Sequence, residues 1–125
     1  MPDPVFLHQL DEIGSRSCGN PFCTHDHLAT CALVPRCHPR SGVRVDYAAV
    51  RPDLPCGAVL RLRCRRCLGP VLEIAVTARV ALTPTCRHGR ACDVQYRAGH
   101  VTVLCHRCHA VQGTAAVAPS VPEPA

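Results

Sequence analysis

Two groups of Cys and His residues have the spacing of metal ligands. The second group places Cys86-x-His88 before an alternating apolar stretch and Cys105-x-x-Cys108 after it. Zn²⁺ takes four Cys or His ligands at tetrahedral corners, with Zn–S bonds of about 2.3 Å. Two Cys separated by two residues satisfy this at a tight turn, and a pair on a neighbouring turn completes the site. We expect these four residues to bind one Zn²⁺.

The first group is less regular. Cys64-x-x-Cys67 is a comparable pair, but the partner turn has Cys37 and His38 next to each other. Neighbouring side chains of an extended strand point to opposite faces, so both can reach one ion only if the backbone turns sharply. We expect Cys37, Cys64 and Cys67 to be ligands, with His38 as the leading fourth ligand. Cys56 and the cluster described next are the alternatives.

A third cluster occupies residues 18–31 and consists of Cys18, Cys23, His25, His27 and Cys31. It could form a closed additional metal site, which is the usual role of Cys-rich clusters in small domains. It could also donate a pair to the first group, or serve as an open and labile site. Cys92 has no partner at metal-ligand spacing, and we expect it to be a small buried apolar residue.

Three other chemistries compete for the Cys-x-x-Cys pairs. The run "CHRCH" matches a haem attachment motif, but covalent haem requires export, and the acidic, polar start of the chain is not an export signal. A thioredoxin-like pair needs a following helix, for which the sequence gives no signal. Zinc deaminases need His-x-Glu and Pro-Cys-x-x-Cys, and neither occurs. With no hydrolytic nucleophile and base in sight, we expect a protein that is not an enzyme.

Composition supports a metal-stabilised fold. The 125 residues include eleven Cys and eight His but no Trp, two Phe and two Tyr. A core so poor in large side chains stabilises a fold weakly, and small domains then recruit metals or disulfides. We expect a cytoplasmic location, because neither an export signal nor an apolar run of about 18 residues is present. In that compartment Cys favours metal over disulfides.

The elements that must position these ligands are mostly β-strands. Apolar residues alternate in "VRVDY", "VLRLR", "VLEIAVTARVAL", "DVQYR" and "HVTVL", which is typical of half-buried strands. Residues 4–13 predict a short amphipathic helix with Phe6, Leu10 and Ile13 on one face. We divide the chain into an N-terminal helix (1–17), a first zinc module (18–69), a second module (70–110) joined through a strand over 71–82, and a disordered tail (111–125).

The two modules share one plan. "ATCALVPRC" (29–37) aligns with "ARVALTPTC" (78–86), and "VLRLRCRRC" (59–67) aligns with "HVTVLCHRC" (100–108). Each half thus has a Pro-led turn with Cys and His, two strands and a Cys-x-x-Cys turn. This plan resembles a zinc ribbon, in which two ligand-bearing turns clamp a metal beside a β-sheet. The resemblance covers 84–108 well and 35–67 less fully, and it implies a small, metal-bound, mostly β fold of two tandem zinc-ribbon-like modules.

Charge suggests the kind of partner. The formal net charge is +5, and two Cys3His zinc sites would lower it to about +3. Four arginines surround the first Cys-x-x-Cys turn and are candidates for nucleic-acid contact: Arg61, Arg63, Arg65 and Arg66. We predict a zinc-binding adaptor that contacts nucleic acid or a protein through this basic face, with no membrane and no small-molecule substrate. The alternative is a metallochaperone-like or thiol-redox protein that uses the cluster at 18–31.

Overall fold

Seven β-strands and one helical turn make up the described part of the chain. The computed structural model describes residues 4–10, 31–33, 35, 37–38, 40–48, 57–79, 81–83, 86–88 and 91–119. The strands are β1 (Cys31–Leu33), β2 (Val43–Ala48), β3 (Ala58–Cys64), β4 (Pro70–Val76), β5 (Cys92–Arg97), β6 (His100–Cys105) and β7 (Val111–Ala116). The mostly β character of the fold is therefore confirmed.

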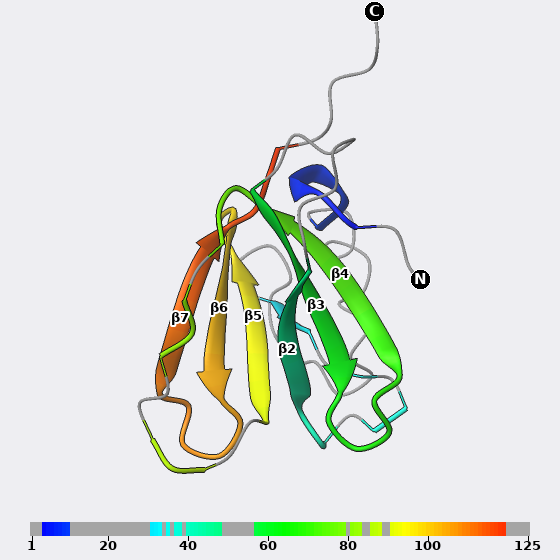
Figure 1. Ribbon diagram of the computed structural model, residues 1–125, viewed down its shortest axis with the longest axis vertical. Coiled ribbons are helices and arrows are strands. Elements are labelled where there is room, and N and C mark those ends of the chain that lie inside the picture. The colour runs from blue at the N-terminus through cyan, green and yellow to red at the C-terminus, as the bar shows by residue number, and fades with distance from the viewer. Residues whose placement is uncertain are drawn as a thin grey trace, which may run out of the picture.

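The strands form one antiparallel sheet with the order β4-β3-β2-β5-β6-β7, and β1 pairs with β5. The middle strands β2 and β5 meet only at Val43 and Cys92. Figure 1 shows the two triplets of strands leaning together at the top and diverging toward the turns at the bottom. At the converging end Val76 pairs with Val117, so the outer strands are connected there as well.

The predicted alternation explains β3, β5 and β6. Leu60 and Leu62 are buried while Arg61 and Arg63 are half-buried, as expected for a strand with one face in the core. The apolar core contains side chains from both halves of the chain, among them Leu62 and Val94. Both predicted modules therefore contribute side chains to the same apolar core.

Strand β4 differs from the expectation. The pattern predicted a strand over 71–82, but β4 ends at Val76, and it pairs along its length with β3 of the first half. Glu73 and Ala75, on the expected outer face, are also buried. Phe6 of the N-terminal segment packs with Ala75 on this face, and Val5 pairs in parallel with Ile74 at the edge of β4.

The N-terminal helix is short within the described residues. Only residues 7–10 are helical, and Phe6 N–H donates to Gln9 Oε1 at 2.9 Å, a side-chain cap of the first turn. Phe6 and Leu10 are buried, so this apolar face is used within the protein. Ile13 and the expected end of the helix lie outside the described residues.

Strand β7 corrects the first part of the predicted disordered tail (111–125), whose last six residues lie outside the described part of the chain. Residues 111–116 pair with β6, although "VQGTAA" lacks the alternation of apolar residues that marks a half-buried strand. Its pairing follows from the Cys-x-x-Cys turn, which returns the chain antiparallel to β6. The last described residues also belong to the fold, because Ala118 N–H donates to Ala75 O at 2.8 Å.

The two Cys-x-x-Cys turns have the same geometry. Cys64 N–H donates to Gly69 O, and Cys105 N–H donates to Ala110 O, each at 2.9 Å. Each turn also ends on a non-glycine residue with left-handed backbone, Leu68 (φ 60°) in the first and His109 (φ 62°) in the second. A shift of pairing register precedes both turns, in β3 and in β6. Residues 41 apart in the sequence thus take equivalent positions.

Candidate metal centres

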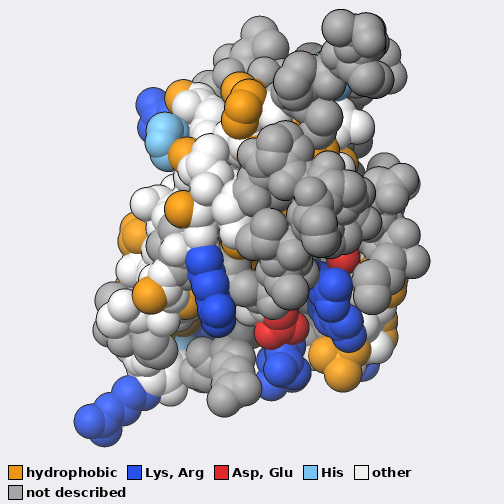
Figure 2. Space-filling view, turned by 45° about the horizontal axis from the view of Figure 1, so that its top comes forward, with side chains coloured by type: hydrophobic (Ala, Val, Ile, Leu, Met, Phe, Trp, Pro, Cys, Tyr) orange, Lys and Arg blue, Asp and Glu red, His pale blue; other side chains and the backbone are white. Residues whose placement is uncertain are grey.

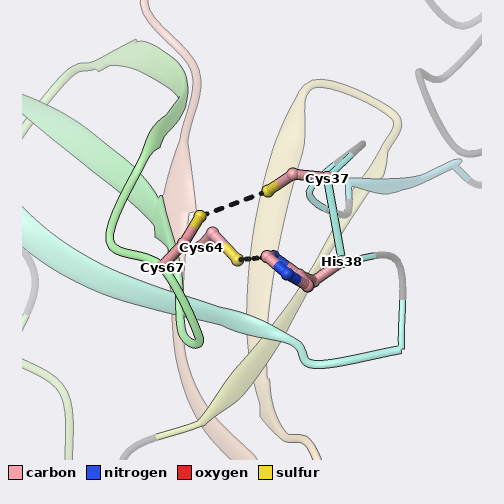
Figure 3. Close-up of side chains that lie close together, drawn as sticks. All are labelled: Cys37, His38, Cys64 and Cys67. Atoms are coloured by element: carbon pink, nitrogen blue, oxygen red, sulfur yellow. Dashed lines mark hydrogen bonds between the residues drawn. The ribbon is translucent and has the colours of Figure 1, made fainter.

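The first group of ligands comes together at the lower end of β3. The ligand atoms of Cys37, His38, Cys64 and Cys67 all lie within 4.8 Å of one another. Cys37 Sγ lies 3.4 Å from Cys67 Sγ, and Cys64 Sγ lies 3.4 Å from His38 Nδ1 (Figure 3). Zn–S bonds of about 2.3 Å place tetrahedral ligands about 3.8 Å apart, so four such atoms fit around one ion.

The turn before β2 explains how the adjacent residues Cys37 and His38 can both face the same site. Cys37 and His38 both lie in a bend, and Ser41 N–H donates to His38 O at 3.0 Å, which closes a tight turn. The two side chains therefore converge instead of pointing to opposite faces (Figure 3). His38 is thus the fourth member of the group. The alternative ligand Cys56 lies outside the described residues.

The second group is built in the same way. The ligand atoms of Cys86, His88, Cys105 and Cys108 also lie within 4.8 Å of one another, and Cys105 Sγ is 3.7 Å from His88 Nδ1. Cys105 ends β6, and Cys108 lies in the turn to β7. The sequence spacing had pointed to all four residues of this group.

Each Cys-x-x-Cys turn lowers the pKa of its first cysteine. Burial on its own would raise the pKa of Cys64, but the backbone N–H groups of Cys67 and Arg66, with side-chain hydrogen bonds, lower that pKa to about 6. The pKa of Cys105 is likewise lowered to about 6, chiefly by the backbone N–H of Cys108. The pKa of Cys37 is raised to about 11, first by its hydrogen bond with Cys67. Thiolates are the form that binds metal.

The donor set indicates the class of metal. Three sulfurs and one imidazole nitrogen match the closed structural sites of Zn²⁺, whereas Ca²⁺ and Mg²⁺ require oxygen ligands. Each group supplies four protein ligands, so a tetrahedral ion would have no open position for a substrate. Cys64 and Cys105 are buried, while Cys37, Cys67 and Cys108 are exposed, so each site lies at the surface with one sulfur in the core.

A polar contact that the sequence did not reveal joins the second site to the first. His106, next to Cys105, places Nδ1 2.7 Å from Asp93 Oδ1 and Nε2 2.9 Å from Arg40 O. Both partners are acceptors, so an imidazolium satisfies them together. Gly42 leaves room for the ring, because a Cβ there would lie 3.0 Å from it. No spacing rule links these residues, since they come from three separate segments.

The remaining candidates have different outcomes. Cys18, Cys23, His25 and His27 lie outside the described residues, and of Cys31 the structure describes only the backbone, in β1. Within the described ranges no third group of potential ligands is found. Cys92 is buried as predicted, and its Sγ lies 3.4 Å from Gln112 Oε1.

The basic residues near the first site are not equivalent. Arg61 Nε donates to Glu73 Oε1 at 3.0 Å, and Glu73 is 7% exposed, so part of this positive charge is neutralised. Arg63 is half-buried, while Arg65 and Arg66 are exposed in the turn. Among the described residues, no helix has the length and apolar character needed to cross a membrane.

Comparisons of the chain with protein-family models, with curated proteins and with solved structures gave no match. Its function must therefore be inferred from the geometry of the two ligand groups and their surroundings.

Proposed function

We propose that the protein is a non-catalytic zinc adaptor built from two tandem zinc-ribbon-like modules. The observation that carries this proposal is the presence of two complete groups of three Cys and one His, each joining the turn before a hairpin to the turn after it. Closed four-ligand sites of this kind stabilise small folds and leave no coordination position for chemistry. The repeated geometry of the two Cys-x-x-Cys turns supports a duplicated module.

A structural role for the metal agrees with the small core. Each ion would cross-link segments that the sheet alone joins weakly, since β2 and β5 share a single residue pair. Binding of structural zinc in zinc-finger peptides contributes about 10–16 kcal/mol at neutral pH, which is then folding free energy. Two such ions would outweigh the deficit left by the missing large side chains.

Native mass spectrometry of the full chain tests this proposal. We expect one Zn²⁺ for each described group, loss of one ion in Cys108→Ser, and no loss in Cys92→Ser, which changes a buried thiol outside both groups. Removal of the metal with a chelator should unfold the sheet, and the dispersed amide resonances in the NMR spectrum should then be lost. A reduced chain that keeps its fold without metal, or a Cys108→Ser variant that keeps every ion, would overturn the proposal.

Metal handling is a second candidate, favoured by the exposure of Cys37, Cys67 and Cys108, which lets a partner thiol reach the ion. A competing zinc-binding peptide separates the two functions. A structural site loses its metal only on the timescale of unfolding, whereas a metallochaperone passes it on while the fold persists.

The distribution of arginine favours a protein partner for the adaptor. Figure 2 shows the described arginine side chains of the face in view standing apart from one another, whereas a groove that follows a nucleic-acid strand needs continuous positive charge and aromatic residues for stacking. The aromatic Tyr96 is buried.

A further inference from the structure

A small groove lies beside the first Cys-x-x-Cys turn, between β3 and β4. It has a volume of about 210 Å³, and its lining residues are Arg61, Leu62, Arg63, Leu68, Pro70, Leu72 and Glu73. The pairing register shifts here, because Leu62 faces Leu72 while Arg63 faces Pro70, which leaves Val71 as an extra residue. Such a bulge bends a strand locally and redirects its side chains.

Leu68, the exposed apolar residue of the groove, is not required by the geometry of the turn. Leu68 is 49% exposed and has a left-handed backbone, a conformation that leucine rarely adopts. The equivalent residue of the second turn is His109, which has the same backbone conformation and is also exposed. Since the same turn forms with a polar residue in this position, turn geometry does not explain an exposed leucine.

The charge of the groove is positive. Glu73 is already engaged by Arg61 at 3.0 Å, while Arg63 lines the groove and the exposed Arg65 and Arg66 lie in the adjoining turn. The equivalents of Arg63 and Arg65 in the second half are Leu104, which is buried, and His106, which is held by Asp93. The equivalent of Arg66 is the exposed Arg107. The first turn therefore carries more arginine than the second.

We propose that this groove docks an acidic segment of a partner protein, which inserts one aliphatic side chain beside Leu68 and places its carboxylates against Arg63, Arg65 and Arg66. This proposal rests on the adaptor function and names its partner. A volume of about 210 Å³ is below the 300–1,000 Å³ usual for small-molecule sites and suits a single side chain. The lack of aromatic lining residues disfavours stacking of nucleic-acid bases.

The test uses the zinc-loaded full chain and a displayed library of random heptapeptides. Selected peptides should be enriched in Asp and Glu around one Leu, Ile or Val, and should shift the amide resonances of Arg63, Leu68 and Leu72. Substituting Ala for the aliphatic residue of the peptide, or raising the salt from 50 to 500 mM, should weaken binding by about tenfold or more.

Leu68→Asn separates docking from stability. Asn tolerates the left-handed conformation better than Leu, so this variant should keep its zinc content and its resistance to denaturant while losing about tenfold in peptide affinity. The matched variant His109→Asn, at the equivalent position of the second turn, should bind the peptides normally. Arg63→Glu should lose binding as well.

Several outcomes would overturn the proposal. They are selected peptides without acidic or aliphatic enrichment, equal binding by Leu68→Asn and the parent chain, or random single-stranded DNA that binds the same residues more tightly than the peptides. Zinc content is measured on every sample. If the parent chain holds two ions but selects no such peptides, the docking groove alone is refuted, whereas a chain that folds without zinc would refute the adaptor itself.

Discussion

Val43 and Cys92 face each other across the two middle strands, and each is also paired with a buried ligand, Val43 with Cys64 and Cys92 with Cys105. The four residues form one continuous row across β3, β2, β5 and β6. Strands lie about 4.8 Å apart, so the row spans about 14 Å from ligand to ligand. The two groups of candidate ligands are therefore connected by backbone hydrogen bonding and packing.

Loss of one metal should weaken the other. In Cys67→Ser the first site lacks a ligand. Cys64, at one end of the row, is then no longer fixed by a bound ion. We expect the zinc affinity of the second site to fall about fivefold, which corresponds to a coupling of about 1 kcal/mol. Competition titration with a chromophoric chelator measures this. The exposed substitution Thr114→Ala serves as the control, and an unchanged second site in Cys67→Ser would show that the centres are independent.

His106 should stabilise the folded state. His106→Ala removes two hydrogen bonds at a half-exposed position, and we expect a loss of about 1 kcal/mol in the free energy of unfolding. Denaturant titration of the zinc-loaded protein measures it, with the neighbouring exposed Arg107→Ala as the control. Equal stability of both variants would mean that the contacts with Asp93 and Arg40 contribute nothing.

The same contact predicts a pH dependence. The hydrogen bond to Asp93 raises the pKa of His106, so the folded state binds this proton more tightly than the unfolded state. The stabilisation is then complete below the ordinary pKa of about 6.5 and is lost as the pH rises through the raised value. The stability difference between the parent chain and His106→Ala should shrink on going from pH 6 to pH 9. A difference that grows with pH contradicts this assignment.

Metal affinity should fall steeply in mild acid. The thiols of Cys64 and Cys105 have pKa values of about 6. They are therefore mostly deprotonated at pH 7 and become protonated below pH 6. Zinc must then displace one more proton per site, and the slope of log affinity against pH should increase by about one per site. Titrations between pH 5 and pH 7.5 would reveal it. A constant slope would mean that neither thiol takes up a proton within this pH range.

Cys92 should resist alkylation. Burial raises the pKa of its thiol to about 11, and thiolates are the reactive form. Iodoacetamide at pH 8 should leave Cys92 unmodified in the zinc-loaded protein and modify it after unfolding with chelator and denaturant, as read by peptide mass mapping. Rapid labelling in the native state would show that this part of the core opens readily.

The sequence allowed prediction of the two Cys/His groups better than of the strands. Cys-x-x-Cys and Cys-x-His spacing brings such side chains together through local geometry, so the grouping of Cys86, His88 and Cys105 could be predicted from spacing alone. The adjacent pair Cys37 and His38 was harder to assign, because its convergence depends on a bend that the spacing does not show. Strand β7 could not be recognised from apolar alternation, since its partner β6 and the preceding turn determine its pairing.

The contact between Arg61 and Glu73 is a second feature that the sequence pattern could not predict. Alternation placed both residues on an outer face, and there they would be solvated. Glu73 is instead buried, so its carboxylate needs a cationic partner, which Arg61 supplies. Whether a remote segment packs on a given strand depends on tertiary contacts that a local pattern does not contain.

The bridge between Val76 and Val117 has a consequence for the symmetry of the molecule. These valines occupy equivalent positions, as do Val43 and Cys92, so in both places a residue meets its own counterpart. Thr77 N–H donates to Ala116 O and Ala118 N–H donates to Ala75 O, each contact mirroring the other. This reciprocity is the rule of isologous two-fold association. The fold therefore has the layout of a homodimer whose two subunits have been joined in a single polypeptide.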